Sequence, residues 1–195
     1  MVSFFNNRLF NSLEVMNIEE TYQKIISNLD GAARGLIRFK PEEIEYLTSY
    51  LQSEDLLQNI EELEKVLCLL DHSASDHQVW EGALLKLLNQ DLTPRLMVFT
   101  LNCSRKHIIQ ARFKKGQRLH FDFLQTLKKL LFSSSPEVVE WTLRTIEECG
   151  NQGVFFLQDF DKIKPPPWKW FNPHNRAVRE IITLLERRWR RFEKP

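Results

Sequence analysis

The sequence predicts an all-α protein, and three observations support that fold class. Apolar residues recur at spacings of three and four along most of the chain, no segment alternates apolar and polar residues over the length of a strand, and only 6 of the 195 residues are glycine. The connections between the periodic segments are mostly short, so consecutive helices are expected to be antiparallel neighbours. We expect about eight to ten helices, given the usual helix length.

In the N-terminal half, a residue that favours a helix start precedes most apolar stripes. Pro41 opens one helix with two acidic residues behind it, and Thr93-Pro94 opens another. Ser53 is expected to cap a helix, and Ser75 or Asp76 the next one. The stripes of these helices are Tyr22, Ile25, Ile26 and Leu29; Ile44, Leu47 and Leu51; Leu56, Ile60, Leu63, Leu67 and Leu70; Val79, Trp80, Ala83, Leu84, Leu87 and Leu88; and Leu96, Val98, Phe99 and Leu101.

In the C-terminal half the same signals continue. Ser104 is expected to cap a short basic helix that Gly116 ends, and Ser135-Pro136 is the clearest helix start in the chain. Gly150 suits the residue that follows a helix end, and Asn172-Pro173 opens the final helix. The stripes are Leu119, Phe123, Leu127, Leu130 and Leu131; Val138, Val139, Thr142, Leu143 and Ile146; Phe155, Phe156 and Phe160; and Val178, Ile181, Ile182, Leu185, Trp189 and Phe192.

The composition is that of one globular domain covering residues 1–195. Hydrophobic residues make up 43% of the chain and charged residues 27%, unlike a disordered protein. Residues 1–17 are expected to be a flexible N-terminal segment. Residues 161–173, DKIKPPPWKWFNP, are expected to form a Pro- and aromatic-rich linker before the C-terminal helix, because three consecutive prolines cannot continue a helix.

Two of the predicted helices are similar to each other. Residues 76–87 and 135–146 each have a capping residue, a Val three positions later, a small residue four positions after that, and then Leu. This pattern resembles the second helix of a HEAT repeat, most closely over residues 75–90 and 134–153. The resemblance implies a HEAT- or armadillo-like array, a right-handed α-α superhelix of stacked helix pairs. The alternative is a compact helical bundle.

The cysteines and the N-terminus predict a cytoplasmic protein. Cys68, Cys103 and Cys149 are an odd number of well-separated thiols, which is not the pattern of a disulfide framework. Residues 6–8 (NNR) interrupt the apolar N-terminus where a signal peptide needs a continuous apolar run. The longest apolar runs are too short to span a bilayer.

Charge is divided unequally along the chain. Residues 1–100 hold 8 Lys and Arg against 16 Asp and Glu, a net charge of −8, and residues 101–195 hold 19 against 10, a net charge of +9. Three explanations stay open: a basic surface for an anionic partner, two halves that attract each other, or head-to-tail self-association. The oligomeric state is not predicted.

Two basic stretches and one aromatic segment are candidate interaction sites. The basic candidates could bind phosphates or an acidic partner, or form solvated helix faces that pair with the acidic half. They are Arg105, Lys106, Arg112, Lys114, Lys115 and Arg118, with Arg187, Arg188, Arg190 and Arg191 near the C-terminus. The aromatic candidates are Trp168, Trp170 and Phe171. They follow a polyproline segment and either form a partner epitope or fold back to seal the core.

No catalytic, cofactor or metal site is predicted. The chain has no P-loop, dinucleotide-binding glycine pattern, nucleophile elbow or zinc-binding spacing. Cys103 and His107 lie four residues apart, but no third residue is placed to orient them. His72 and His77 lie five residues apart, which suits no single helix face for a metal.

Two functions from different classes follow. The first is a non-enzymatic protein–protein interaction module, a scaffold whose second helices offer a concave face to a protein partner. The alternative is a nucleic-acid-binding protein that uses the basic C-terminal half, including one that acts on DNA bases as some HEAT-like proteins do.

Overall fold

The computed structural model describes residues 16–29, 36–53, 55–169 and 171–189. Within these ranges the chain is all-helical, as the sequence predicts, and an isolated bridge between Ile37 and Ser73 is the one β-type pairing. None of the helices in these ranges is long and apolar enough to cross a membrane. The α-helices are α1 (Ile18–Leu29), α2 (Pro41–Gln52), α3 (Ile60–Asp71), α4 (Glu81–Leu88), α5 (Pro94–Ser104), α6 (Ala111–Lys114), α7 (Phe121–Leu130), α8 (Pro136–Glu148), α9 (Leu157–Ile163) and α10 (Pro173–Trp189). Shorter 3₁₀ or π-helical segments are η1 (Leu56–Gln58), η2 (Gln78–Trp80), η3 (Arg105–Gln110), η4 (Gly150–Phe156) and η5 (Pro167–Lys169).

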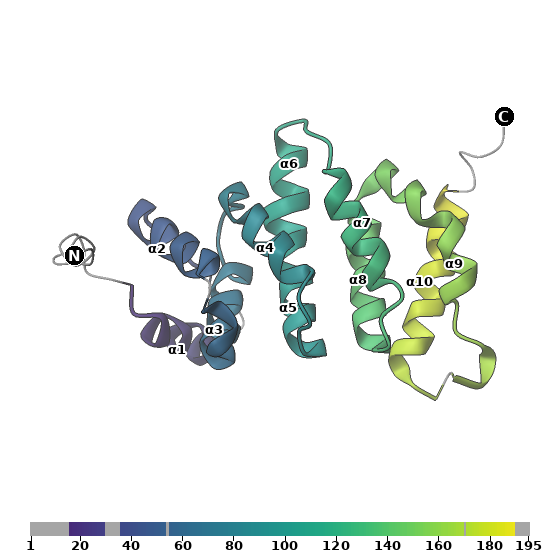
Figure 1. Ribbon diagram of the computed structural model, residues 1–195, viewed down its shortest axis with the longest axis horizontal. Helices are drawn as coiled ribbons and strands as arrows, with labels where there is room; N and C mark the ends of the chain where they lie inside the picture. The colour runs from purple at the N-terminus through teal and green to yellow at the C-terminus, as the bar shows by residue number, and fades with distance from the viewer. Residues whose placement is uncertain (1–15, 30–35, 54, 170, 190–195) are drawn as a thin grey trace, which may run out of the picture.

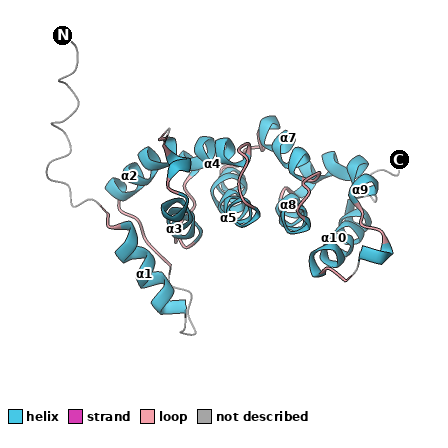
Figure 2. Ribbon diagram, turned by 60° about the horizontal axis from the view of Figure 1, so that its bottom comes forward, coloured by secondary structure: helices cyan, strands magenta, loops and turns pink. Residues whose placement is uncertain are grey.

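The helices are arranged along the longest axis of the molecule, with α1 to α3 at one end, α4 to α8 in the middle and α9 and α10 at the other end (Figure 1). They form two layers (Figure 2). The upper layer holds α2, α4, α7 and α9, and the lower layer holds α1, α3, α5, α8 and α10. In the lower layer each helix packs directly on the next, α1 on α3, α3 on α5, α5 on α8 and α8 on α10. From α2 onward the chain therefore alternates between the layers.

The core runs along the row between the two layers. Apolar side chains of both layers meet there with no exposed surface, because the stripes predicted from the sequence face one another. From the lower layer these include Leu67, Leu101, Leu143 and Ile182, and from the upper layer Leu47, Leu84, Phe123 and Phe160. The indole of Trp80 is also fully buried, and its N–H donates to the hydroxyl of Thr48 at 3.0 Å, so no polar group is left without a partner there.

Most of the predicted helix ends are confirmed. Pro41, Pro94 and Pro136 each occupy the first position of a helix, and the Ser135 hydroxyl accepts from the amide of Val138. Gly116 and Gly150 follow helix ends with φ angles of 67° and 58°, a left-handed conformation that glycine adopts without a steric penalty.

Three predicted caps are wrong. Neither Ser75 nor Asp76 caps the helix that follows, because η2 begins at Gln78 after His77 and α4 begins at Glu81 after Trp80, both without a side-chain cap. Ser53 does not start the helix that contains Leu63 and Leu67: a 3₁₀ turn intervenes, and α3 begins at Ile60, where the Asn59 side chain accepts from the amide of Glu62. Ser104 is not a cap either, because α5, the π-helical η3 and α6 follow without a break, and the Ser104 hydroxyl donates to the carbonyl of Thr100. A π-helical turn holds more residues than an α-helical turn, so it changes which side chains face the core.

The two segments expected to be irregular are partly helical or outside the described residues. α9 continues to Ile163, so the start of the segment 161–173 is helical and the irregular part begins at Lys164. Residues 1–15 lie outside the described part of the chain. Met16 is buried, and the Asn17 side chain accepts from the amide of Glu20 at the start of α1, so these two residues belong to the fold.

The end of α10, the last helix, packs against a glycine. A β-carbon added at Gly153 in η4 would overlap the indole ring of Trp189, which is buried at the end of α10. Interiors are packed too closely to absorb such an overlap without displacement. Gly153 thus lets η4 and the end of α10 approach closely.

Candidate interaction surfaces

At least one ion pair joins each neighbouring pair of helices in the lower layer. The nitrogen–oxygen distances are 2.7 Å for Glu19–Lys65, 3.2 Å for Glu64–Arg95 and 2.9 Å for Glu147–Arg188. The pairs are Glu19–Lys65 between α1 and α3, Glu64–Arg95 between α3 and α5, Arg105–Glu148 from the end of α5 to α8, and Glu147–Arg188 between α8 and α10. Two of the predicted anion-binding arginines, Arg105 and Arg188, therefore have carboxylate partners within the fold.

The remaining cations of the stretch 105–118 mostly bind the connection between α3 and α4. The Lys106 ammonium donates to the backbone carbonyls of Asp71 and Ser73. Lys114 pairs with Asp76, and Lys115 donates to the side-chain carbonyl of Gln78. Partial burial lowers the pKa of Lys106 from its ordinary value, because the charged form is less well solvated there.

His107, which is buried in the core, also binds the connection between α3 and α4. We call His107 together with Lys106, Lys114 and Lys115 the clamp. Its Nδ1 accepts from the backbone amide of His77 at 2.9 Å, and its Nε2 lies 2.9 Å from the carbonyl of Leu70. Burial lowers the pKa of His107 to about 3, so the ring is neutral at physiological pH. An acceptor at Nδ1 places the proton on Nε2, where it is donated to Leu70. The ring thus joins η3 to both ends of the connection.

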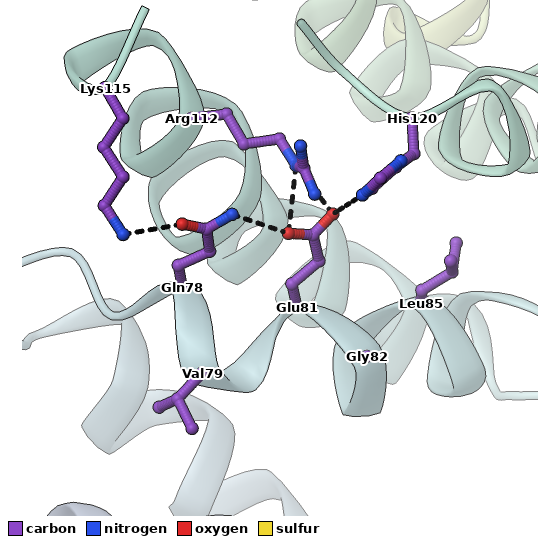
Figure 3. Close-up of a pocket in the computed structure, with 8 residues that line it drawn as sticks. All are labelled: Gln78, Val79, Glu81, Gly82, Leu85, Arg112, Lys115 and His120. Atoms are coloured by element: carbon purple, nitrogen blue, oxygen red, sulfur yellow. Dashed lines mark hydrogen bonds and ion pairs between the residues drawn. The ribbon is translucent and has the colours of Figure 1, made fainter. Parts of the chain in front are cut away.

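Arg112 and Glu81 form a nearly buried ion pair at an open depression on the upper layer (Figure 3). The side chains are 9% and 12% exposed, and Arg112 Nε lies 2.8 Å and 3.0 Å from the two carboxylate oxygens. Arg112 Nη1 also donates to the carbonyl of Arg118. His120 Nε2 is 3.9 Å from the same carboxylate. The Arg112 guanidinium is thus engaged with the protein itself.

The predicted basic candidates divide into three groups. Arg105, Lys106, Arg112, Lys114, Lys115 and Arg188 are held by intramolecular partners. Arg118 and Arg187 are exposed, and no ion pair joins either side chain to a described residue. Arg190 and Arg191 lie outside the described residues.

Two aromatic–arginine pairs lie on the outer surface of the lower layer and were missed from the sequence. α5 packs on α3, α8 and α4, and α8 packs on α5, α10 and α7, so the free side of both helices faces away from the upper layer. The Arg95 guanidinium lies 5.7 Å from the ring centre of Phe99 on α5, and that of Arg144 lies 5.5 Å from Trp141 on α8. Both rings are half-buried. Phe99 belongs to the predicted stripe of its helix, which gave no signal that one edge stays open.

The aromatic segment is turned outward. Trp168 is 75% exposed and Phe171 is 99% exposed, so these two rings do not fold back to seal the core. Trp170 lies outside the described residues. The sequence identified the residue types but could not show on which side of the chain they lie.

Cys103 and His107 are not arranged as a nucleophile and its base. The Cys103 thiol is completely buried and donates to the carbonyl of Leu67, and burial raises its pKa well above the ordinary value, whereas a reactive thiol needs a lowered pKa. Both ring nitrogens of His107 are already occupied. Among these residues no three His, Cys, Asp or Glu side chains gather as metal ligands.

Comparisons with protein-family models, with curated protein sequences and with solved structures give no match for this chain. Functional inference therefore rests on the chain's own residues.

Proposed function

We propose that this chain is a non-enzymatic interaction module of the cytoplasm, built as a HEAT-like, right-handed α-α superhelix, that binds a protein partner across α5 and α8. The alternation of the chain between two layers and the helix-by-helix packing of the lower layer support stacked pairs over a compact bundle. Three free thiols, on or directly after helices, support a reducing compartment.

The observation that carries the binding surface is the pair of half-buried rings, Phe99 and Trp141, each beside an arginine. Trp and Arg are enriched among the residues that dominate protein–protein binding energy. A ring that is already half-buried also loses little conformational entropy when it binds a partner. The ion pairs of Arg95 with Glu64 and of Arg144 with Glu140 hold these guanidinium groups in place. The surface is therefore ordered before a partner arrives.

A protein partner fits these observations better than a nucleic acid does. Phosphate binding needs cations that are free to replace counterions. In the stretch 105–118, however, most cations already have intramolecular partners, and Arg112 is nearly buried with Glu81. Nucleic-acid binding is therefore the result that would contradict the proposal in the second test below.

The test compares protein capture by the wild type with capture by two variants of the α5–α8 surface. Phe99→Ser with Trp141→Ser removes the rings, and Arg95→Ala with Arg144→Ala removes the guanidinium groups without opening the core. A partner of this surface should be lost, by at least about tenfold in affinity, with both variants. Phe113→Ser, which removes an exposed ring from α6, is the matched control and should retain the partner.

The nucleic-acid alternative is tested by fluorescence anisotropy with single- and double-stranded DNA and RNA across a salt series. The informative variant is Lys115→Ala with Arg118→Ala, because Arg112→Ala would break a buried ion pair and affect folding. No binding at low salt is the expected result. Micromolar binding that this variant weakens, together with unchanged protein capture by the α5–α8 variants, would overturn the proposal.

A further inference from the structure

We propose that the C-terminal corner of the molecule docks on an anionic lipid surface. The docking element is the aromatic loop, residues 164–169 and 171–172, together with the first turn of α10. Trp168 and Phe171 enter the interfacial region of the bilayer, and Lys169 and Arg176 meet the headgroups. This binding uses none of the α5–α8 surface and stands independently of the proposed function.

The exposure of these two rings has no explanation within the fold. Phe171 is 99% exposed and Trp168 is 75% exposed, whereas Trp80 and Trp189 are fully buried. Bulky aromatic side chains gathered on one surface element mark an interaction site. The loop joins the ends of α9 and α10 at the edge of the molecule (Figure 1), where it can reach a flat surface.

The base of the loop is fixed, so the rings are presented in an ordered conformation. Pro165 is buried, and its carbonyl accepts from Arg179 Nη1 at 3.2 Å. The Asn175 side chain donates to the carbonyl of Lys169 at 3.4 Å. An element that is ordered in advance loses less entropy when it binds.

Part of the loop backbone has no free amide hydrogen. Pro165, Pro166 and Pro167 have no amide hydrogen. The amide of Lys169 donates to the carbonyl of Pro166 at 3.0 Å, and the amide of Asn172 donates to the carbonyl of Lys169 at 3.3 Å. Unpaired amide donors are costly in the apolar part of a bilayer. The prolines and the paired amides of Lys169 and Asn172 therefore lower the cost of dehydrating the loop at a lipid surface.

Along the sequence, the charge of the loop and of the first turn of α10 has a single sign. No acidic residue lies between Asp161 and Glu180, a span that holds five Lys and Arg residues. Lys162 and Lys164 pair with Asp159 and Glu186, and Arg179 is bonded to the Pro165 carbonyl. The remaining cations are Lys169 and Arg176.

Both of these side chains are exposed, and no ion pair joins either to a described residue. An anionic bilayer surface complements them without requiring a matched array of carboxylates. Trp in particular favours the boundary between headgroups and acyl chains. Two rings and two cations make a weak, reversible anchor that needs both contributions.

The experiment measures sedimentation of the full chain with vesicles of phosphatidylcholine alone and with about 30 mol% phosphatidylglycerol. Binding is expected only to the anionic vesicles, and it should weaken as NaCl rises from about 50 to about 500 mM. Trp168→Ser with Phe171→Ser should lower the partition coefficient at least about tenfold. Since both rings are exposed, the variant should keep its circular dichroism spectrum and urea midpoint.

The matched control is Phe113→Ser with Phe132→Ser, which removes two other exposed rings, 42% and 52% accessible, and should bind within about twofold of the wild type. The α5–α8 variants should also bind vesicles normally, so failure of this proposal and failure of the proposed function are distinguishable. Absence of binding to anionic vesicles, or equal losses in the two double variants, overturns the proposal and leaves a protein pocket as the receptor of the rings.

Discussion

Two acid-free, cation-rich stretches of this chain have opposite structural roles. Residues 92–121 and residues 162–179 each contain several Lys and Arg and no Asp or Glu. In the first, the side chains of η3 and α6 turn to the connection between α3 and α4 and to Glu148. In the second, Lys169 and Arg176 stay exposed beside two exposed rings.

The difference lies in the supply of partners rather than in the cations themselves. The first stretch passes along the acidic N-terminal half, where Asp76, Glu81 and several backbone carbonyls are within reach. The second stretch lies at the far end of the row, away from that half (Figure 1). A basic stretch in a sequence therefore predicts a binding surface only after its intramolecular partners are known.

The largest expected effect comes from breaking the buried pair in the first stretch. Arg112→Leu removes the partner of Glu81, whose side chain is 12% exposed, and leaves an uncompensated, nearly buried carboxylate. We expect the free energy of unfolding in urea to fall by about 3 kcal/mol. Adding Glu81→Leu should recover a substantial part of the loss. If Arg112→Leu lowers the free energy of unfolding no more than an exposed substitution such as Arg187→Ala, the Arg112–Glu81 pair does not stabilise the fold.

The second largest effect comes from disturbing the contact between η4 and α10, the helix that contains the end of the second stretch. Gly153→Ala places a methyl group against the buried indole of Trp189 and is expected to cost about 2 kcal/mol of overpacking. Urea denaturation measures this cost. The double variant with Arg112→Leu should show nearly additive losses, with any coupling carried by the hydrogen bonds between Gln152, next to Gly153, and Leu119, next to Arg118. Strong non-additivity would mean that the two stretches are coupled.

The clamp should also weaken as pH falls. His107 is neutral in the folded state with a pKa of about 3, because burial disfavours its charged form, and its ordinary value is about 6.5. The unfolded state therefore binds the extra proton first, and stability that is complete above pH 6.5 is lost as pH falls toward 3. At pH 5 the loss from this group is about 2 kcal/mol.

The measurement for His107 is the free energy of unfolding of the wild type and of His107→Gln, each determined from about pH 7.5 down to about pH 5. The variant should be less stable at neutral pH and should depend less on pH across this range. A residual dependence is expected because burial also lowers the pKa of His77. Equal slopes in the two proteins would contradict the assignment of a neutral, buried ring.

The smallest effects distinguish exposed members of the two stretches. The Lys114–Asp76 pair is 65% exposed on the lysine side, so Lys114→Ala should lower the free energy of unfolding by less than about 1 kcal/mol. Its measurable consequence is a rise in the pKa of the Asp76 carboxyl, which the hydrogen bond from Lys114 now holds below its ordinary value. NMR titration of Asp76 would detect this. Arg187→Ala should change neither quantity.

Much of the helical framework could be predicted because its signals are local. A cap or proline acts within one turn, so Pro41, Ser135-Pro136 and Asn172-Pro173 identify helix starts correctly, and Gly116 and Gly150 mark helix ends. Ser53 was misleading because Asn59, a second good cap, lies just downstream. Ser104 was misleading because the packing of the run from α5 to α6, not the residue itself, decides that the helix continues.

The candidate surfaces were less predictable because their partners are distant in sequence. Arg112 meets Glu81, and Arg105 meets Glu148, across 31 and 43 residues. The sequence predicts these cations as candidate binding residues and is equally consistent with their pairing within the fold. The residue types at Trp168 and Phe171 were equally visible, but their outward direction depends on the anchoring of Pro165 and Lys169 by α10, which periodicity does not reveal.

The difference between the two stretches is tested most directly by vesicle binding of two matched charge reversals. Lys115→Glu with Arg118→Glu and Lys169→Glu with Arg176→Glu change net charge equally, and all four side chains are exposed. On anionic vesicles we expect the second variant to lose binding at least about tenfold and the first to stay within about threefold of the wild type. Equal losses, or a larger loss in the first variant, would contradict the separation of an internal clamp from an outward docking surface.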